Sequence, residues 1–224
     1  SAEDCAVAFS ALHGPDGHDA TVHAAPFEWD GNAGVRGLRV GVLRADFERQ
    51  TVTKPFDTAA LAVLADLGVT FVDVALPPQP YNAMRIILTA EAGAAFDALM
   101  RSGRTSELAS QGPGAWPATF RQAHFIPAPD YINANRARTL AIRAWEELMQ
   151  RVDVIVAPTN SGQLLATNLT GHPAVILPHG FRENGTPVSL TFIGRLFDEA
   201  TLLRVAHAYQ RQTDFHLRRP PAFG

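Results

Sequence analysis

Residues 38–78, LRVGVLRADFERQTVTKPFDTAALAVLADLGVTFVDVALPP, decide the class of fold. The first six of these residues read as a strand, and residues 69–76 alternate as a second strand that stops at two prolines. Residues 58–67 favour a helix, with Pro55 near its start and Gly68 just past its end. A strand, a helix and a strand within about 40 residues predict a βαβ unit and therefore a parallel pair of strands.

The last third of the chain adds signals of antiparallel pairing. Residues 153–157 form a short apolar run, typical of a buried strand. Residues 174–177 and 188–193 flank Asn184-Gly185, which predicts a hairpin with a longer loop. Residues 198–212 predict a last helix capped by its first residue, an aspartate. The apolar stripe of this helix is formed by Leu202, Val205, Ala206 and Tyr209. Together these signals predict an α/β fold, with a mixed sheet flanked by helices on both faces.

Two longer helices, predicted at 81–101 and 129–151, each place one charge on an apolar face. In the second helix, Arg138 falls within a stripe formed by Ala134, Ala141, Trp145, Leu148 and Val152. Arg136 and Arg143 fall on the opposite face of that helix. In the first helix, Glu91 shares a face with Met84, Ile87, Ala94 and Ala98.

A buried guanidinium needs a carboxylate or another planar acceptor. Two interpretations of Arg138 therefore stay open. It forms a structural ion pair with a carboxylate such as Glu91, or it faces a pocket and binds a polar group of a substrate.

The first residues of the chain predict a capped helix. Ser1 is placed as the N-cap of a helix over residues 2–12, with Glu3 and Asp4 in its first turn. Cys5 lies near the apolar side of this helix and is expected to be a small core residue. The sequence opens on this cap and has no initiator methionine, so we expect it to be part of a longer chain.

Composition excludes several classes of protein. The 224 residues are 46% hydrophobic and 18% charged, which favours a globular protein with a sizeable core. The net charge of −3 gives no basic excess for nucleic acid or an anionic membrane surface. No apolar run approaches the roughly 20 residues of a membrane span, and no signal peptide opens the sequence, so we expect a soluble, cytoplasmic protein. The single cysteine excludes an internal disulfide and a cysteine-based zinc site.

No motif for a catalytic nucleophile or a metal stands out. There is no G-x-S-x-G elbow, and Ser161 is read as an ordinary loop serine. Thr51 and Lys54 have the spacing of a Ser-x-x-Lys pair, but a threonine stands where that motif has its serine nucleophile. The histidines of the first loop lack a ligand geometry and are expected to be solvated: His13, His18 and His23. His172 and His179 would face opposite ways on one continuous strand, so we predict no metal site.

An ordered run of motifs in the last third resembles the C-terminal half of the amidase signature family. The motifs are DVIVAPT at 153–159, NLTGHPA at 168–174, LPHGF at 177–181, GTPVS at 185–189 and FIGRLFDE at 192–199. The NRART run at 135–139, the βαβ unit and the opening SAEDCA at 1–6 are also similar to the family. The resemblance covers nearly the whole chain.

The resemblance implies a fold and a reaction. The fold is one α/β/α domain around a twisted mixed sheet. The reaction is hydrolysis or transfer of an amide, in which a serine attacks the carbonyl and a second serine relays a proton to a lysine. The backbone amides of a Gly-rich loop hold the oxyanion. In the family these elements precede the segment matched here, and this chain has no Gly-Gly-Ser-Ser stretch, while Lys54 does not match the family's lysine.

We therefore expect no catalytic residue in this chain and an incomplete fold that lacks the N-terminal catalytic half. The chain is expected to supply sheet and pocket wall. Arg138 matches by motif an arginine that binds polar substrate groups in some family members. Asn168, Thr170 and Gly171 are candidates to line the pocket, with packing at a strand edge as the alternative. The stretch from Thr159 to Asn168 is short for the family.

The resulting hypothesis is the C-terminal portion, over residues 1–224, of a single amidase domain. We expect a helical and βαβ part at about 1–151 and a strand-hairpin-helix part at about 152–224. The implied partners are a small-molecule amide substrate and the N-terminal half, without metal or organic cofactor, and a homo-oligomer stays open. Alone, the chain is expected to be inactive and to self-associate through exposed edges.

A free-standing amidase is our first choice within the family, ahead of the glutaminase subunit of a tRNA amidotransferase. Outside it, a non-enzymatic truncated paralogue that binds a ligand or a full-length amidase stays open. So does a split enzyme, with its catalytic half on another chain.

Overall fold

The computed structural model describes residues 1–159 and 161–219. The strands are β1 (Arg39–Val42), β2 (Thr70–Asp73), β3 (Val154–Pro158), β4 (Ala174–Phe181) and β5 (Pro187–Gly194). The α-helices are α1 (Ala2–Leu12), α2 (Arg44–Arg49), α3 (Lys54–Asp66), α4 (Tyr81–Met84), α5 (Ile86–Ala95), α6 (Asp97–Arg101), α7 (Trp116–Ala123), α8 (Ala128–Met149), α9 (Gln163–Thr170) and α10 (Glu199–Arg211). Short 3-10 helices are η1 (Arg104–Glu107) and η2 (Phe215–Leu217). Within these described ranges, no helix is long and apolar enough to cross a membrane.

The chain divides into two compact units. The first contains the whole sheet and comprises residues 1–77 together with the chain from residue 145 onward. The second comprises residues 78–144 and contains α4 to α7 and most of α8. The chain leaves the first unit after Pro77 and re-enters it within α8, at Trp145.

The sheet is mixed, with the strand order β2-β1-β3-β5-β4. β1 pairs in parallel with β2 and with β3, whereas β5 pairs antiparallel with β3 and with β4. Gly185, in the turn between β4 and β5, has a φ of 78°, which glycine adopts without steric cost. The predicted parallel pair, hairpin and mixed sheet are confirmed.

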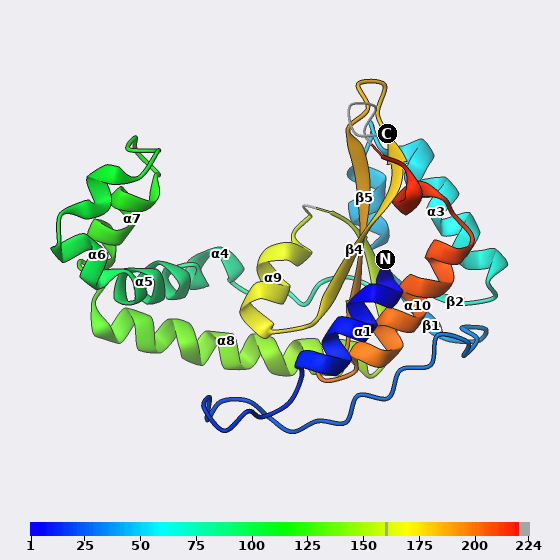
Figure 1. Ribbon diagram of the computed structural model, residues 1–224, viewed down its shortest axis with the longest axis horizontal. Coiled ribbons are helices and arrows are strands. Elements are labelled where there is room, and N and C mark those ends of the chain that lie inside the picture. The colour runs from blue at the N-terminus through cyan, green and yellow to red at the C-terminus, as the bar shows by residue number, and fades with distance from the viewer. Residues whose placement is uncertain (160, 220–224) are drawn as a thin grey trace. The chain divides into compact units, whose positions relative to one another are not determined.

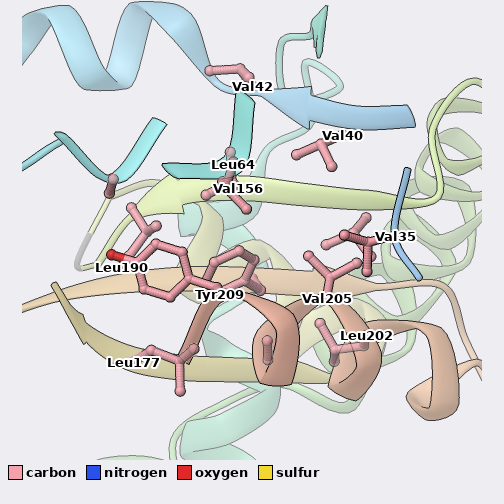
Figure 2. Packing of buried hydrophobic residues seen from close by; sticks show 14 of the residues in the cluster. Val35, Val40, Val42, Leu64, Val156, Leu177, Leu190, Leu202, Val205 and Tyr209 are labelled. Atoms are coloured by element: carbon pink, nitrogen blue, oxygen red, sulfur yellow. The ribbon is translucent and has the colours of Figure 1, made fainter. Parts of the chain in front are cut away.

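One face of the sheet packs against α3 and α10. Figure 2 shows Leu202, Val205 and Tyr209 of α10 lying over Val156 and Leu190 of the sheet. Each of these five side chains is at most 1% exposed. The apolar stripe predicted for the last helix is therefore the surface that closes this core.

The opposite face of the sheet is also buried. Ile155 and Ile193 are both 0% exposed, and the Thr191 hydroxyl lies 2.9 Å from that of Thr159. Figure 1 shows α9 on the other side of the β4–β5 hairpin from α1 and α10. Helices thus flank both faces, as predicted.

Both N-caps predicted from the sequence, Ser1 and Asp198, are confirmed. The Ser1 hydroxyl accepts from the Asp4 N–H, and the Asp4 side chain returns the contact in a capping box. The Asp198 carboxylate accepts from the Thr201 N–H at 3.2 Å. Cys5 is exposed, so its assignment to the core is wrong, because the buried face of α1 runs through Ala2 and Ala6.

The region expected to be one helix over 81–101 is broken into α4, α5 and α6, with breaks at Arg85 and Phe96. A helical wheel assumes an unbroken rotation, so the predicted face does not continue past the breaks. Glu91, Ala94 and Ala98 are exposed, which corrects the inward charge assigned to this helix. The sequence reading also missed α2, η1, α7, α9 and η2, and it placed the start of α3 four residues late.

Candidate functional site

Arg138 is half-buried in the middle of α8. The stripe predicted beside it is buried throughout: Ala134, Ala141, Trp145, Leu148 and Val152. Arg136 and Arg143 are exposed, as expected for the opposite face. Arg138 thus differs from the neighbouring arginines of its helix in being partly covered, which is the placement that a substrate-binding or structural guanidinium requires.

Glu91 was the suggested structural partner of Arg138. Its carboxylate is exposed and accepts a 3.0 Å hydrogen bond from the Tyr131 hydroxyl. Glu91 is therefore bound to another residue of α8 and does not form the inward-pointing charge that the sequence predicted.

Asn168, Thr170 and Gly171 come together at the C-terminal end of α9 in the first unit, not at a strand edge. Gly171 ends the helix with a φ of 82°, the left-handed cap that favours glycine. Asn168 is exposed, and its carboxamide makes no hydrogen bond with any residue that the structure describes. Of the three, Asn168 alone presents a polar side chain to solvent.

Thr170 is buried and its hydroxyl is fully used. It donates to the Ala166 carbonyl at 2.9 Å and lies 2.8 Å from Nδ1 of His172. Because the hydroxyl proton goes to Ala166, Nδ1 of His172 carries the proton and donates to Thr170. His172 therefore cannot act as a base toward Thr170 through this contact.

His172 lies just before β4, packed against the Trp145 ring with 4.8 Å between ring centroids. It is 5% exposed, and this burial lowers the pKa of His172 to about 4. The imidazole is consequently neutral near pH 7.

A second buried histidine, His179 in β4, forms a pair that the sequence reading missed. Its Nε2 lies 2.8 Å from Oδ1 of Asp57, whose other oxygen accepts from the Thr53 hydroxyl at 2.8 Å. Burial lowers the pKa of His179, and the hydrogen bond and charge of Asp57 oppose that shift. The two partners are 122 residues apart, so only the presence of a histidine inside an apolar strand hinted at the pair.

The remaining candidates from the sequence do not assemble into a site. Thr51 and Lys54 are exposed, and Ser161 is half-buried. In residues 1–159 and 161–219, no group of three or more histidine, cysteine, aspartate or glutamate side chains is arranged to hold a metal ion.

A sequence model of the family described as Amidase matches residues 1–166. This chain belongs to the amidase signature family. The glutamyl-tRNA(Gln) amidotransferase subunit of Chloroflexus aurantiacus is 34% identical over 265 aligned positions, which cover 97% of this chain and 54% of the relative. The subunit of the same name from Ralstonia nicotianae is 31% identical, with 99% of this chain and 57% of that protein covered.

Solved structures of amidase signature enzymes have the same fold. A bacterial aryl acylamidase gives a TM-score of 0.80 at 19% identity, covering 98% of this chain and 54% of that one. Peptide amidase from Stenotrophomonas maltophilia gives a TM-score of 0.78 at 25% identity, and the match covers 99% of this chain and 53% of that one.

The chain spans about half the length of the curated relatives it matches. The alignment with the Chloroflexus relative is longer than the 224 residues of this chain, so that relative also carries internal positions that are missing here.

Proposed function

We propose that this chain supplies sheet and pocket wall to an amidase that hydrolyses carbon–nitrogen amide bonds. The serine nucleophile, the relay serine and the lysine base then lie in a catalytic half outside these 224 residues. Family membership carries the proposal, together with a span of about half the relatives' length and the lack of a Gly-Gly-Ser-Ser stretch. On this proposal no residue of the chain is catalytic, and the chain alone is inactive.

Arg138 is proposed to bind a polar group of the substrate, and Asn168 to contribute a further hydrogen bond. Support for Arg138 comes from the NRART run and from its half-buried position on α8. Support for Asn168 comes from its exposed, unengaged carboxamide. Within the first unit, Thr170 and Gly171 are proposed to contribute pocket wall through their backbone, since the Thr170 hydroxyl is engaged and Gly171 has no side chain.

The test of Arg138 uses the native polypeptide that contains this chain. We expect Arg138→Ala to raise KM for an amide substrate by about tenfold or more, since a hydrogen bond to a charged group is lost, with kcat changed far less. Arg136→Ala is the matched control, because that arginine is exposed on the same helix. Loss of folding in Arg138→Ala, with normal KM in a folded Arg138→Lys protein, would favour the structural role.

The native mass tests the larger proposal. We expect a polypeptide of about twice the 24.2 kDa of this chain, with a Ser-Ser-Lys half ahead of residue 1. A native chain of 24.2 kDa would instead require a second polypeptide, and mixing experiments with a separate catalytic half would test that split enzyme. If the native chain is 24.2 kDa and no catalytic half restores activity, the non-enzymatic paralogue is the remaining interpretation.

A second candidate is the amidotransferase role named for the relatives. Both of the curated relatives described above are subunits of glutamyl-tRNA(Gln) amidotransferases. Glutamine-dependent amide transfer in the presence of co-purifying proteins would support this role. Hydrolysis of simple amides without such partners would support the free-standing amidase.

A further inference from the structure

The helix α9 has 8 residues, which is too short to be stable by itself, so its place in the first unit depends on tertiary contacts. Most of its side chains are buried: Gln163, Ala166, Thr167, Leu169 and Thr170. Asn168 lies among them but is exposed to solvent. The rotation of α9 about its own axis therefore sets the direction of the Asn168 carboxamide.

His172 fixes the carboxyl end of α9. Its Nδ1–H donates to the Thr170 hydroxyl at 2.8 Å, and its ring lies against the Trp145 ring with 4.8 Å between centroids. Trp145 is 0% exposed and belongs to the carboxyl end of α8. On the other side of His172, the carbonyl of Pro173 accepts from the Gly194 N–H of β5 at 2.9 Å. The imidazole thus links the end of α9 to α8 at a point where the chain is already anchored to the sheet.

A histidine at this position has a cost that an apolar side chain would avoid. His172 is 5% exposed, and its Nε2 is buried without a hydrogen-bond partner among the residues that the structure describes. An unpartnered buried nitrogen is unfavourable, whereas an apolar ring would pack on Trp145 without that penalty. What the histidine adds is one directional hydrogen bond to Thr170, and that bond reaches α9 only.

We propose that His172 is a positioning residue, which orients the Asn168 carboxamide toward the substrate through Thr170. The inference rests on the substrate-binding role proposed for Asn168 above. Thr170 follows Asn168 by two residues in the same helix, and its hydroxyl also donates to the Ala166 carbonyl at 2.9 Å, one turn earlier. A change at His172 therefore reaches Asn168 through a single helical turn. It alters substrate binding and leaves the chemical step to the catalytic half.

The experiment is a double-mutant cycle on KM in the native polypeptide that contains this chain, with the amide that it hydrolyses best from a panel of primary amides and anilides. We expect Asn168→Ala and His172→Ala each to raise KM by about threefold or more, with kcat changed far less. In the Asn168→Ala background, His172→Ala should raise KM no further, because both changes remove the same contact with substrate. His172→Asn keeps a donor for Thr170 and should retain a KM near that of the wild type. His207→Ala is the matched control, since His207 is a half-buried histidine on α10 of the same unit, and it should leave KM unchanged.

Thr170→Val tests the same hydrogen bond from its other end and decides the question if His172→Ala does not fold. It removes the hydroxyl, and its effect on KM should likewise vanish in the Asn168→Ala background. If Asn168→Ala raises KM but the changes at the hydrogen bond do not, or raise it equally in both backgrounds, the positioning role is overturned and the binding role of Asn168 stands. A KM for His172→Asn as high as that for His172→Ala also overturns the positioning role. An unchanged KM in Asn168→Ala, or no hydrolysis of any amide by the wild type, overturns both proposals.

Discussion

Asp153 links the ends of three strands through hydrogen bonds. Its Oδ2 accepts from the backbone N–H of Arg39 at the start of β1, and its Oδ1 accepts from the side chains of Arg39 and Arg195. Burial alone would raise the pKa of Asp153, but these hydrogen bonds and the two guanidinium charges outweigh it and lower the pKa. The carboxylate is thus held ionised where β1, β3 and β5 meet.

Removing this charge should destabilise the sheet. We expect Asp153→Asn to lower the free energy of unfolding by about 2 kcal/mol, because hydrogen bonds to charged groups are worth more than neutral ones. Asp73→Asn breaks an exposed pair with Arg44 and should cost less than about 1 kcal/mol. Urea unfolding of both variants measures the difference, and equal values would refute the role given to Asp153.

His172 should make the stability of the first unit depend on pH. Its folded pKa of about 4 lies below the ordinary 6.5, so between these values the unfolded chain binds a proton that the folded chain does not. The free energy of unfolding should therefore fall by up to about 3 kcal/mol from pH 7 to pH 4 and change little further from this group below pH 4.

His172→Asn tests this contribution because an asparagine amide can still donate to Thr170 but does not titrate. The variant should lose less stability than the wild type over the same pH range. The control is His18→Asn, at an exposed histidine, which should retain the wild-type profile. Identical profiles for all three proteins would contradict the assignment of the acid sensitivity to His172.

At the scale of elements, α3 packs against β4 through two adjacent contacts. Asp57 bonds to His179, and the Phe56 ring covers the backbone of Gly180. A Cβ built at Gly180 would lie 2.3 Å from the Phe56 ring, so this close approach depends on glycine. The contact fixes the start of the crossover helix over the far edge of the sheet.

Gly180→Ala should therefore push α3 away from β4. We expect it to cost about 2 kcal/mol of unfolding free energy, through forced displacement of Phe56. Gly34→Ala, where a Cβ would meet nothing within 4 Å, should change stability by less than about 0.5 kcal/mol. Phe56→Leu in the Gly180→Ala background should recover part of the loss, and a double-mutant cycle without coupling would contradict the contact.

Elements with a local sequence signal could be predicted, whereas contacts between distant parts of the chain could not. The βαβ unit, the hairpin and the stripe of α10 were predictable, because each has a local period or turn signal. Glu91 lies in the unbroken helix α5, whose buried face turns through Ala92 and Gly93 toward Ala123 of α7, and this packing has no local sequence signal. The Asp57–His179 pair could not be predicted, since it joins residues that are 122 positions apart in the chain.

At the scale of the whole molecule, the sheet ends in an unpaired edge. β4 is the last strand in the order, and among the residues that the structure describes it pairs with β5 alone. Ile176, in the middle of β4, is 54% exposed. The relatives are about twice as long as this chain, so a larger protein has further chain available to cover such an edge.

The 224-residue chain produced alone should consequently self-associate through β4. We expect wild type to sediment as oligomers, and Ile176→Lys to shift it toward monomer, because a lysine on an edge strand opposes strand pairing. Val7→Lys is the matched control, since Val7 is 64% exposed on α1 rather than on the sheet edge. Equal effects of the two lysines would point to general apolar contact instead of edge pairing. A monodisperse wild-type chain would show that this half of the fold closes its own edge in solution.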